Sequence, residues 1–121
     1  MQLIHERTRK CVADSVEMAE TRRERRRGLL GRDGMQDGEA LMLIPCIAVH
    51  TAFMRFSIDV IFVDGDGRVV KTVSRLQPWR MAMCLRGRSV IELPAGRLES
   101  FKLDVGDRLY LTPMKEQRRA S

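Results

Sequence analysis

Patterns that identify a membrane-spanning or secreted protein are missing from this 121-residue sequence. The longest apolar stretch, residues 40–49, is interrupted by Pro45, whereas a membrane-spanning helix needs about 20 residues. The first residues contain no apolar run of the length found in secretory signals. These absences exclude a spanning helix and predict a cytoplasmic location, unless a signal precedes the sequence.

Cysteine and histidine are scarce. The three cysteines, Cys11, Cys46 and Cys84, include no close pair, whereas disulfide frameworks use even numbers and structural zinc sites use closely spaced pairs. We interpret each cysteine as a small buried hydrophobe with a free thiol. The two histidines, His5 and His50, lack the spacing of a metal-binding pair. The sequence therefore predicts no metal and no cofactor.

The signatures of nucleotide-binding proteins and of serine hydrolases are also absent. The sequence has no Gly-x-x-x-x-Gly-Lys-Ser/Thr loop, no Gly-x-Gly-x-x-Gly turn and no Gly-x-Ser-x-Gly elbow. Aromatic residues make up only 5% of the chain, which argues against a base-stacking surface for nucleic acid.

The net charge of +6 is concentrated in two short segments. Residues 22–27 contribute +4 and residues 115–121 contribute +2, so the rest of the chain is electrically balanced. We interpret this arginine cluster as a solvated helix face with a basic bias; the alternative is a surface that binds a polyanion, an acidic protein or a lipid. The arginines of the first segment are Arg22, Arg23, Arg25, Arg26 and Arg27.

The length and the spacing of turns predict one mainly β domain. We place it at residues 1–113, followed by a polar basic tail at 114–121 that we expect to be disordered. Short apolar runs between turn residues indicate strands, and their number predicts a compact antiparallel β-sandwich or barrel. The expected strands are residues 2–5, 11–19, 41–44, 49–56, 58–63, 69–76, 89–93 and 108–112.

One N-terminal amphipathic helix is expected to pack outside this β domain. Thr21 and Glu24 have the spacing of a capping box, which starts a helix at about Arg22. The helix is predicted to end near Leu30, before a glycine, and its last leucines are expected to dock on the body. A single further helical turn is predicted at residues 97–101.

The chemistry of His50 and two acids is open to several interpretations. His50, Asp59 and Glu92 lie on predicted strands and have the chemistry of a hydrolase or a metal site. Cys46 precedes His50 by four residues, a spacing compatible with a thiol–imidazole pair but not specific for one. The favoured interpretation of Asp59 and Glu92 is that they are buried acceptors that bind an arginine or backbone N–H groups.

The long irregular segment at residues 77–88 contains the only tryptophan, Trp79, beside Arg80. Loops of this length are commonly functional. A tryptophan next to arginines serves as a ligand platform or a cation–π partner, and equally as a hydrophobic plug over one end of a barrel.

A series of motifs runs through residues 10–112. It begins with Arg26-Arg27-Gly28-Leu29-Leu30-Gly31-Arg32 and ends with Val105-Gly106-Asp107; between them come residues 50–64, 66–70, 78–80 and 90–96. In order and spacing these motifs resemble the small bacterial and archaeal family called domain of unknown function 192. Leu30 stands where methionine is common in that family, and Ser57 where proline is common.

The resemblance implies a compact, mostly antiparallel β domain similar to a jelly roll, with one helix outside, and no established activity. Because buried charges need partners, we expect at least one arginine–carboxylate pair in the core, drawn from Arg32, Asp59, Glu92 and Asp107. A small cavity is the default ligand site. Its expected lining is His50, Thr51, Met54, Trp79, Arg80 and Glu92.

The favoured function is therefore a non-enzymatic β module that binds a small molecule or a protein. One alternative is a hydrolase that uses His50 with Asp59 or Glu92. The other is polyanion binding through the cluster Arg22–Arg27, with nucleic acid as the least favoured polyanion. The sequence predicts no particular oligomeric state.

Overall fold

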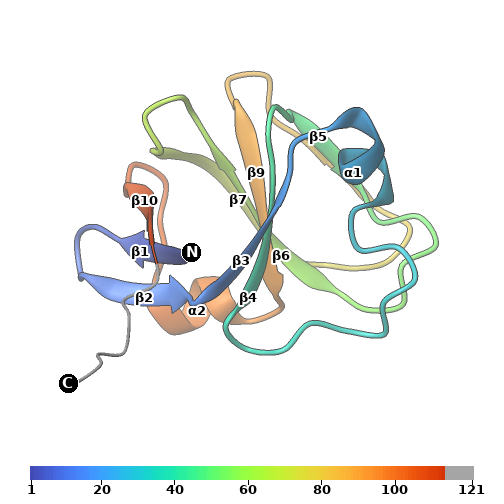
Figure 1. Cartoon of the computed structure of the whole chain (residues 1–121), viewed down its shortest axis with the longest axis horizontal. Coiled ribbons are helices and arrows are strands. Elements are labelled where there is room, and N and C mark those ends of the chain that lie inside the picture. The colour runs from blue at the N-terminus through green and yellow to red at the C-terminus, as the bar shows by residue number, and fades with distance from the viewer. Residues whose placement is uncertain (114–121) are drawn as a thin grey trace.

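The computed structural model describes residues 1–113, and the predicted disordered tail at 114–121 lies outside the described residues (Figure 1). Residues 1–113 form ten strands and two short helices, which confirms the mainly β prediction. In chain order they are β1 (Gln2–His5), β2 (Lys10–Ala13), β3 (Ser15–Ala19), α1 (Arg22–Arg27), β4 (Glu39–Leu43), β5 (Ala48–His50), β6 (Ile58–Val63), β7 (Val69–Leu76), β8 (Met81–Met83), β9 (Ser89–Pro94), α2 (Arg97–Phe101) and β10 (Leu109–Thr112).

A five-stranded sheet runs through the middle of the molecule in the order β3-β4-β9-β6-β7. Strands β3 and β4 are parallel, and the other neighbours are antiparallel. Every residue of β6 and β9 is buried, which explains why both strands are nearly continuous apolar runs. The acids on these strands, Asp59 and Glu92, are therefore carried into the interior.

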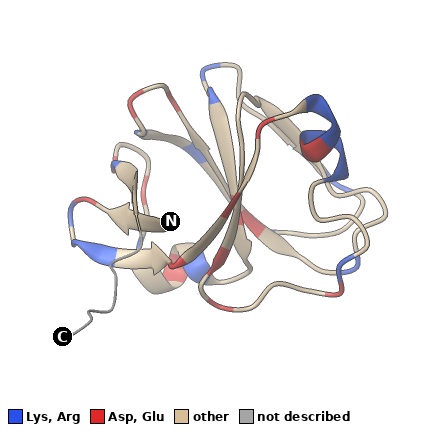
Figure 2. Cartoon of the chain, viewed as in Figure 1, with Lys and Arg blue, Asp and Glu red and all other residues tan. Residues whose placement is uncertain are grey.

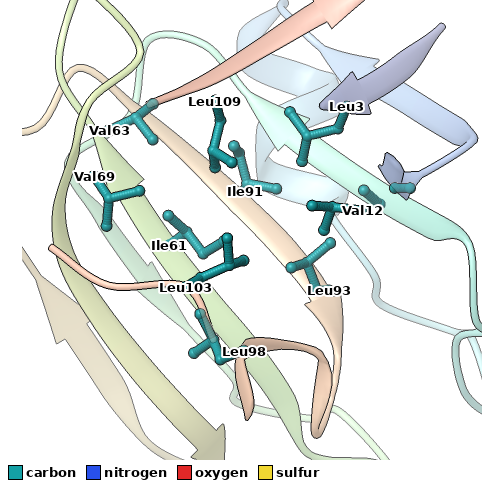
Figure 3. Close-up of a cluster of buried hydrophobic side chains, with 12 residues drawn as sticks. Leu3, Val12, Ile61, Val63, Val69, Ile91, Leu93, Leu98, Leu103 and Leu109 are labelled. Atoms are coloured by element: carbon teal, nitrogen blue, oxygen red, sulfur yellow. The ribbon is translucent and has the colours of Figure 1, made fainter. Parts of the chain in front are cut away.

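Two hydrophobic cores form, one on each face of this sheet. The first core contains Leu3 of β1 and Leu98 of α2, because the sheet β10-β1-β2 and helix α2 cover that face (Figure 3). The second core contains Val49 of β5 and Ala82 of β8, because the two-stranded sheet β5-β8 covers the other face. The described strands form open sheets, so the barrel alternative is wrong.

Helix α1 begins as the sequence predicts but ends earlier. The hydroxyl of Thr21 accepts a hydrogen bond from the Glu24 backbone N–H, and the Glu24 carboxylate accepts one from the Thr21 N–H, each at 3.0 Å. The helix ends at Arg27, where Gly28 leaves it with a φ of 47°. No residue of α1 is buried, so the predicted amphipathic helix is wrong. Leu29, which follows the helix, is buried in the second core instead.

Two predicted strands are shorter than expected, and one strand was not predicted. The strand expected at 11–19 is divided at Asp14, where the chain passes from the three-stranded to the five-stranded sheet. The strand expected at 49–56 ends at His50, because Thr51 opens a turn closed by the Met54 backbone N–H. Residues 81–83, expected to be irregular, form β8 and pair with β5.

The helical turn predicted at 97–101 is confirmed as helix α2. Helix α1 has six residues and α2 has five. Within residues 1–113, no helix is long and apolar enough to cross a membrane.

Candidate functional site beside helix α1

A cavity of about 290 Å³ lies between helix α1 and strands β4, β5 and β9. Its lining combines arginines of α1 with apolar side chains such as Leu43 and Val49 and with one acid, Glu92. His50 and Met54 also line it. The structure therefore brings together three of the six predicted ligand-binding residues, His50, Met54 and Glu92. We call this space the α1 cavity.

Glu92 is the chemically unusual group of the α1 cavity. It lies on β9 between Leu41 of β4 and Val60 of β6, and only 5% of its surface is exposed. None of the hydrogen bonds described in residues 1–113 reaches its carboxyl group, whose oxygens are open to the cavity, because Arg97 Nε is the one fully buried side-chain nitrogen or oxygen without a partner there. Burial raises the pKa of Glu92 to about 7, and the positive charge of Arg32 opposes that rise. A group with this pKa exchanges its proton near neutral pH.

Helix α1 is rich in arginine (Figure 2), and four of its arginines line the α1 cavity and make that side cationic. Arg25 is committed to structure, because its guanidinium donates to the backbone carbonyls of Glu20 and Ile44. The other arginines make no ion pair with residues 1–113, and three of them line the cavity. Those three are Arg22, Arg26 and Arg27. The cavity thus has both an acidic and a cationic side.

Cys46 and His50 both line the α1 cavity, but they do not bind each other. The Cys46 Sγ donates to the carbonyl of Ala48 at 3.1 Å, and burial raises the pKa of this thiol. The His50 Nδ1 accepts a hydrogen bond from the Ala52 backbone N–H at 3.3 Å. The thiol–imidazole pair that the sequence allowed is therefore not formed, and the thiol is not activated.

Asp59 belongs to the other face of the sheet. Side chains alternate along β6, and Asp59 points with Ile61 toward the first core. Its carboxylate accepts hydrogen bonds from backbone N–H groups that come from β7 and from the start of α2. The donors are Arg75 at 2.8 Å, Gly96 at 3.0 Å and Leu98 at 2.8 Å. The interpretation of Asp59 as a buried acceptor of backbone N–H groups is confirmed.

The hydrolase and metal interpretations that joined His50 to Asp59 are therefore wrong, because the two side chains lie on different sides of the central sheet. His50 and Glu92 do share the α1 cavity. In the described part of the chain, no group of three histidine, cysteine or acidic side chains is arranged to hold a metal ion.

Thr51, Trp79 and Arg80 lie outside the α1 cavity. Thr51 is fully buried, and its hydroxyl donates to the Gln77 carbonyl at 2.6 Å and accepts from the Arg80 N–H at 2.8 Å. These bonds fasten the turn after β5 to the turn before β8. Trp79 is 60% exposed on the second turn, so the interpretation of Trp79 as a hydrophobic plug is wrong.

Arg32 and Asp107 form ion pairs with partners that the sequence did not indicate, and the arginines of these pairs lie at the surface. Arg32 binds Glu17 at 2.7 Å, and Arg7 binds Asp107 at 3.1 Å. In every ion pair within residues 1–113 that contains an arginine, that side chain is at least 35% exposed. The expected buried arginine–carboxylate pair is not found, because backbone N–H groups satisfy Asp59 and nothing described satisfies Glu92.

Sequence reasoning missed the role of His5. This residue is fully buried, and its Nε2 lies 2.8 Å from Asp107 Oδ2 while its Nδ1 lies 3.0 Å from the Thr8 hydroxyl. Together with Arg7, this contact holds the pKa of Asp107 well below its usual range. The sequence pattern that could have revealed the burial of His5 is the alternation of residues 2–5, which places His5 on the same buried face as Leu3.

Curated relatives of this chain are uncharacterised. A UPF0127 protein of Pyrococcus horikoshii is 46% identical over 63 residues, which cover 51% of this chain and 54% of that relative. In that comparison the chain spans about half the length of its relative. A UPF0127 protein of Thermococcus kodakarensis is 29% identical over 126 residues, which cover 98% of this chain and 78% of the relative.

Two crystal structures share the fold. A Novosphingobium aromaticivorans protein of unknown function has a TM-score of 0.73 and 22% identity, covering 79% of this chain and 74% of its own. A Sinorhizobium meliloti protein described as a candidate transcription regulator has a TM-score of 0.78 and 21% identity, covering 90% and 89%. A family model described as "Uncharacterized ACR" matches residues 3–111. The chain therefore belongs to the domain of unknown function 192 family, the family that its motifs resemble.

Proposed function

We propose that this domain is a non-enzymatic binding module that holds a small zwitterionic molecule in the α1 cavity. The observation that carries the proposal is Glu92, a nearly buried carboxyl with no hydrogen-bond donor in residues 1–113. A carboxyl group that is largely removed from water and has no protein donor is costly, and native proteins rarely keep one unless another group uses it. An amine or hydroxyl group of a ligand supplies the missing donor.

The rest of the lining defines the other half of the ligand. Arg22, Arg26 and Arg27 line the same cavity and have no acidic partner in the described chain. A guanidinium group binds a carboxylate or phosphate through paired N–H groups. The apolar side chains of Leu43 and Met54 suit a short hydrocarbon part between the two polar ends. A volume of about 290 Å³ restricts the ligand to the size of a small metabolite.

Binding is favoured over catalysis because the candidate reactive groups are engaged by the backbone. The Cys46 thiol donates to a carbonyl, and the His50 Nδ1 accepts from an N–H. A hydrolase based on His50 and Glu92 is the remaining enzymatic alternative. Polyanion binding through α1 stays a prediction that none of these contacts favours.

The test is thermal unfolding with a panel of amino acids, amino phosphates, simple amines and simple acids. A ligand at 100 times its Kd stabilises the native state by about 2.7 kcal/mol. We expect a zwitterion to stabilise the wild type and the Glu99→Gln control, whose exposed acid lies outside the α1 cavity. Glu92→Gln should abolish the effect of an amine-bearing ligand. An equal shift in Glu92→Gln would contradict the proposal.

A further inference from the structure

The end of the molecule that carries β5 and β8 exposes a group of large apolar side chains. The strand pairing sets Val49 and Ala82 inward, and it sets Met81 and Met83 on the opposite, outer face of the small sheet. Connecting turns add further exposed side chains beside this face. We call the whole set the apolar platform; it consists of Ile47, Phe53, Trp79, Met81, Met83 and Leu85.

Two aromatic residues of the apolar platform are held in a strained backbone. Phe53 has a φ of 66° and Trp79 a φ of 65°, a region that bulky residues seldom occupy. Their rings pack together with centroids 4.6 Å apart, yet 72% and 60% of their surfaces remain exposed. Strain of this kind persists only where surrounding contacts impose it, and it gathers at functional positions.

Thr51 imposes that geometry. Besides the contacts of its hydroxyl, its backbone carbonyl accepts hydrogen bonds from the Trp79 N–H at 3.0 Å and the Met54 N–H at 3.1 Å. One buried residue therefore fixes the turns that present both Phe53 and Trp79. The aromatic pair is preorganised outside the core, which costs stability without adding a buried contact.

The two segments that carry the apolar platform are basic. Residues 46–56 and 77–88 contain four arginines and no acidic residue. Arg55 is paired with Asp33, but Arg80 and Arg86 have no acidic partner within residues 1–113. Helix α1 adds its arginines at the same end, because it shares the α1 cavity with β5 (Figure 2).

We propose that the apolar platform docks the protein onto the surface of an anionic phospholipid bilayer. Exposed tryptophan, phenylalanine and leucine beside arginine are the combination that partitions into a lipid headgroup region. The aromatic pair is exposed on turns, and neither ring lines any of the five best-formed cavities. Such a surface suits insertion into a soft interface better than capture of a peptide. A second copy would bring like charges together, which opposes self-association.

Trp79 reports this docking directly, because it is the only tryptophan in the chain. The full-length protein is titrated with vesicles of phosphatidylcholine, with and without phosphatidylglycerol. We expect a blue shift of Trp79 emission and co-sedimentation with the anionic vesicles at low salt, and loss of both at high salt. Neutral vesicles should give neither. No response to anionic vesicles at low salt overturns the proposal.

Matched variants locate the contact. Leu85→Asp places a charge on a side chain that is 76% exposed, so folding is not threatened, and it should abolish vesicle binding. Val105→Asp makes the same change at a site that is 61% exposed outside the apolar platform, and it should bind like the wild type. Arg80→Gln and Arg86→Gln should each weaken partitioning about fivefold. Equal losses in Leu85→Asp and Val105→Asp overturn the proposal.

Other occupants give distinguishable results. A blue shift that grows with protein concentration, without vesicles, identifies a second copy and overturns the bilayer proposal. A shift with soluble polyglutamate but not with vesicles identifies an acidic protein and also overturns it. Glu92→Gln should bind vesicles like the wild type, so this proposal stands or falls independently of the ligand in the α1 cavity.

Discussion

The buried acids on the two faces of the central sheet differ in their hydrogen bonding. On the first-core face, Asp59 accepts three backbone hydrogen bonds, and His5 is bound by both Asp107 and Thr8. On the second-core face, Glu92 receives no hydrogen bond from residues 1–113, although it is almost as deeply buried. The same sheet thus carries one acid that the protein's own N–H groups satisfy and one whose carboxyl group is left to the α1 cavity.

This difference separates an acid that stabilises the fold from an acid that is available to bind a ligand. Asp59 joins β6 to β7 and to α2, so its contacts are those of a structural tie. Glu92 joins no other element through a hydrogen bond, and the arginines of α1 and the strained pair Phe53 and Trp79 lie at its end of the molecule. When a feature lowers stability and makes no contact that supports the fold, a role in function is the best explanation for it.

The largest effect is expected on the satisfied face. Asp59→Ala removes the acceptor of three N–H groups in a buried site, and each unsatisfied donor costs about 1–3 kcal/mol. We expect a loss of about 3–5 kcal/mol in the free energy of unfolding, measured by urea denaturation. Asp66→Ala, at an exposed side chain, should change it by less than about 0.5 kcal/mol. A comparably small loss for Asp59→Ala would show that its hydrogen bonds to β7 and α2 do not stabilise the fold.

On the face that carries Glu92, the free energy of unfolding should depend on pH. Because the folded pKa of Glu92 is raised from 4.5 to about 7, the native state holds a proton that the unfolded chain has released. Stability from this group is therefore present below about pH 4.5, falls between about 4.5 and 7, and is lost above that range. The total is on the order of 3 kcal/mol.

Glu92→Gln removes this titration. Urea denaturation from pH 5 to 8 should show the wild type losing stability relative to Glu92→Gln as the pH rises. Glu99→Gln, at an exposed acid, should follow the wild-type curve. Parallel curves for wild type and Glu92→Gln would mean that Glu92 has a partner near neutral pH, and the contrast between the two faces would disappear.

The sequence predicted the parts of the fold that local patterns determine. The apolar runs of β6 and β9, the capping box of Thr21 and the turn of α2 are each encoded within a few residues, and each is confirmed. Strand β8 was missed because its three residues are paired only with β5, and the burial of Ala82 alone leaves almost no periodic signal. The break at Asp14 was missed because it arises where the chain changes sheets.

The candidate site was predicted in part, because sequence identifies residue types but not the face on which they lie. His50, Met54 and Glu92 meet in one cavity, as expected. Thr51 and Trp79 were expected to line the same cavity. The structure instead buries one and exposes the other, since a turn reverses the chain directly after β5.

The smallest expected effect concerns the support of the apolar platform. Thr51→Val keeps the shape of the side chain but removes the acceptor of the Arg80 N–H and the donor to the Gln77 carbonyl. We expect a loss of about 1–2 kcal/mol in unfolding free energy. Thr72→Val, at a partly exposed position on β7, should change stability by less than about 0.5 kcal/mol.

The informative readout for Thr51→Val is the fluorescence anisotropy of Trp79. If the hydroxyl fixes both turns, the tryptophan gains motion, its anisotropy falls, and vesicle binding weakens because the aromatic pair must be ordered on contact. Thr72→Val should leave anisotropy unchanged. A stable Thr51→Val protein with wild-type anisotropy would show that the backbone bonds of Thr51 suffice. In that case Phe53 and Trp79 owe their strained conformation to the chain path between β5 and β8, and the contrast between the faces rests on Glu92 alone.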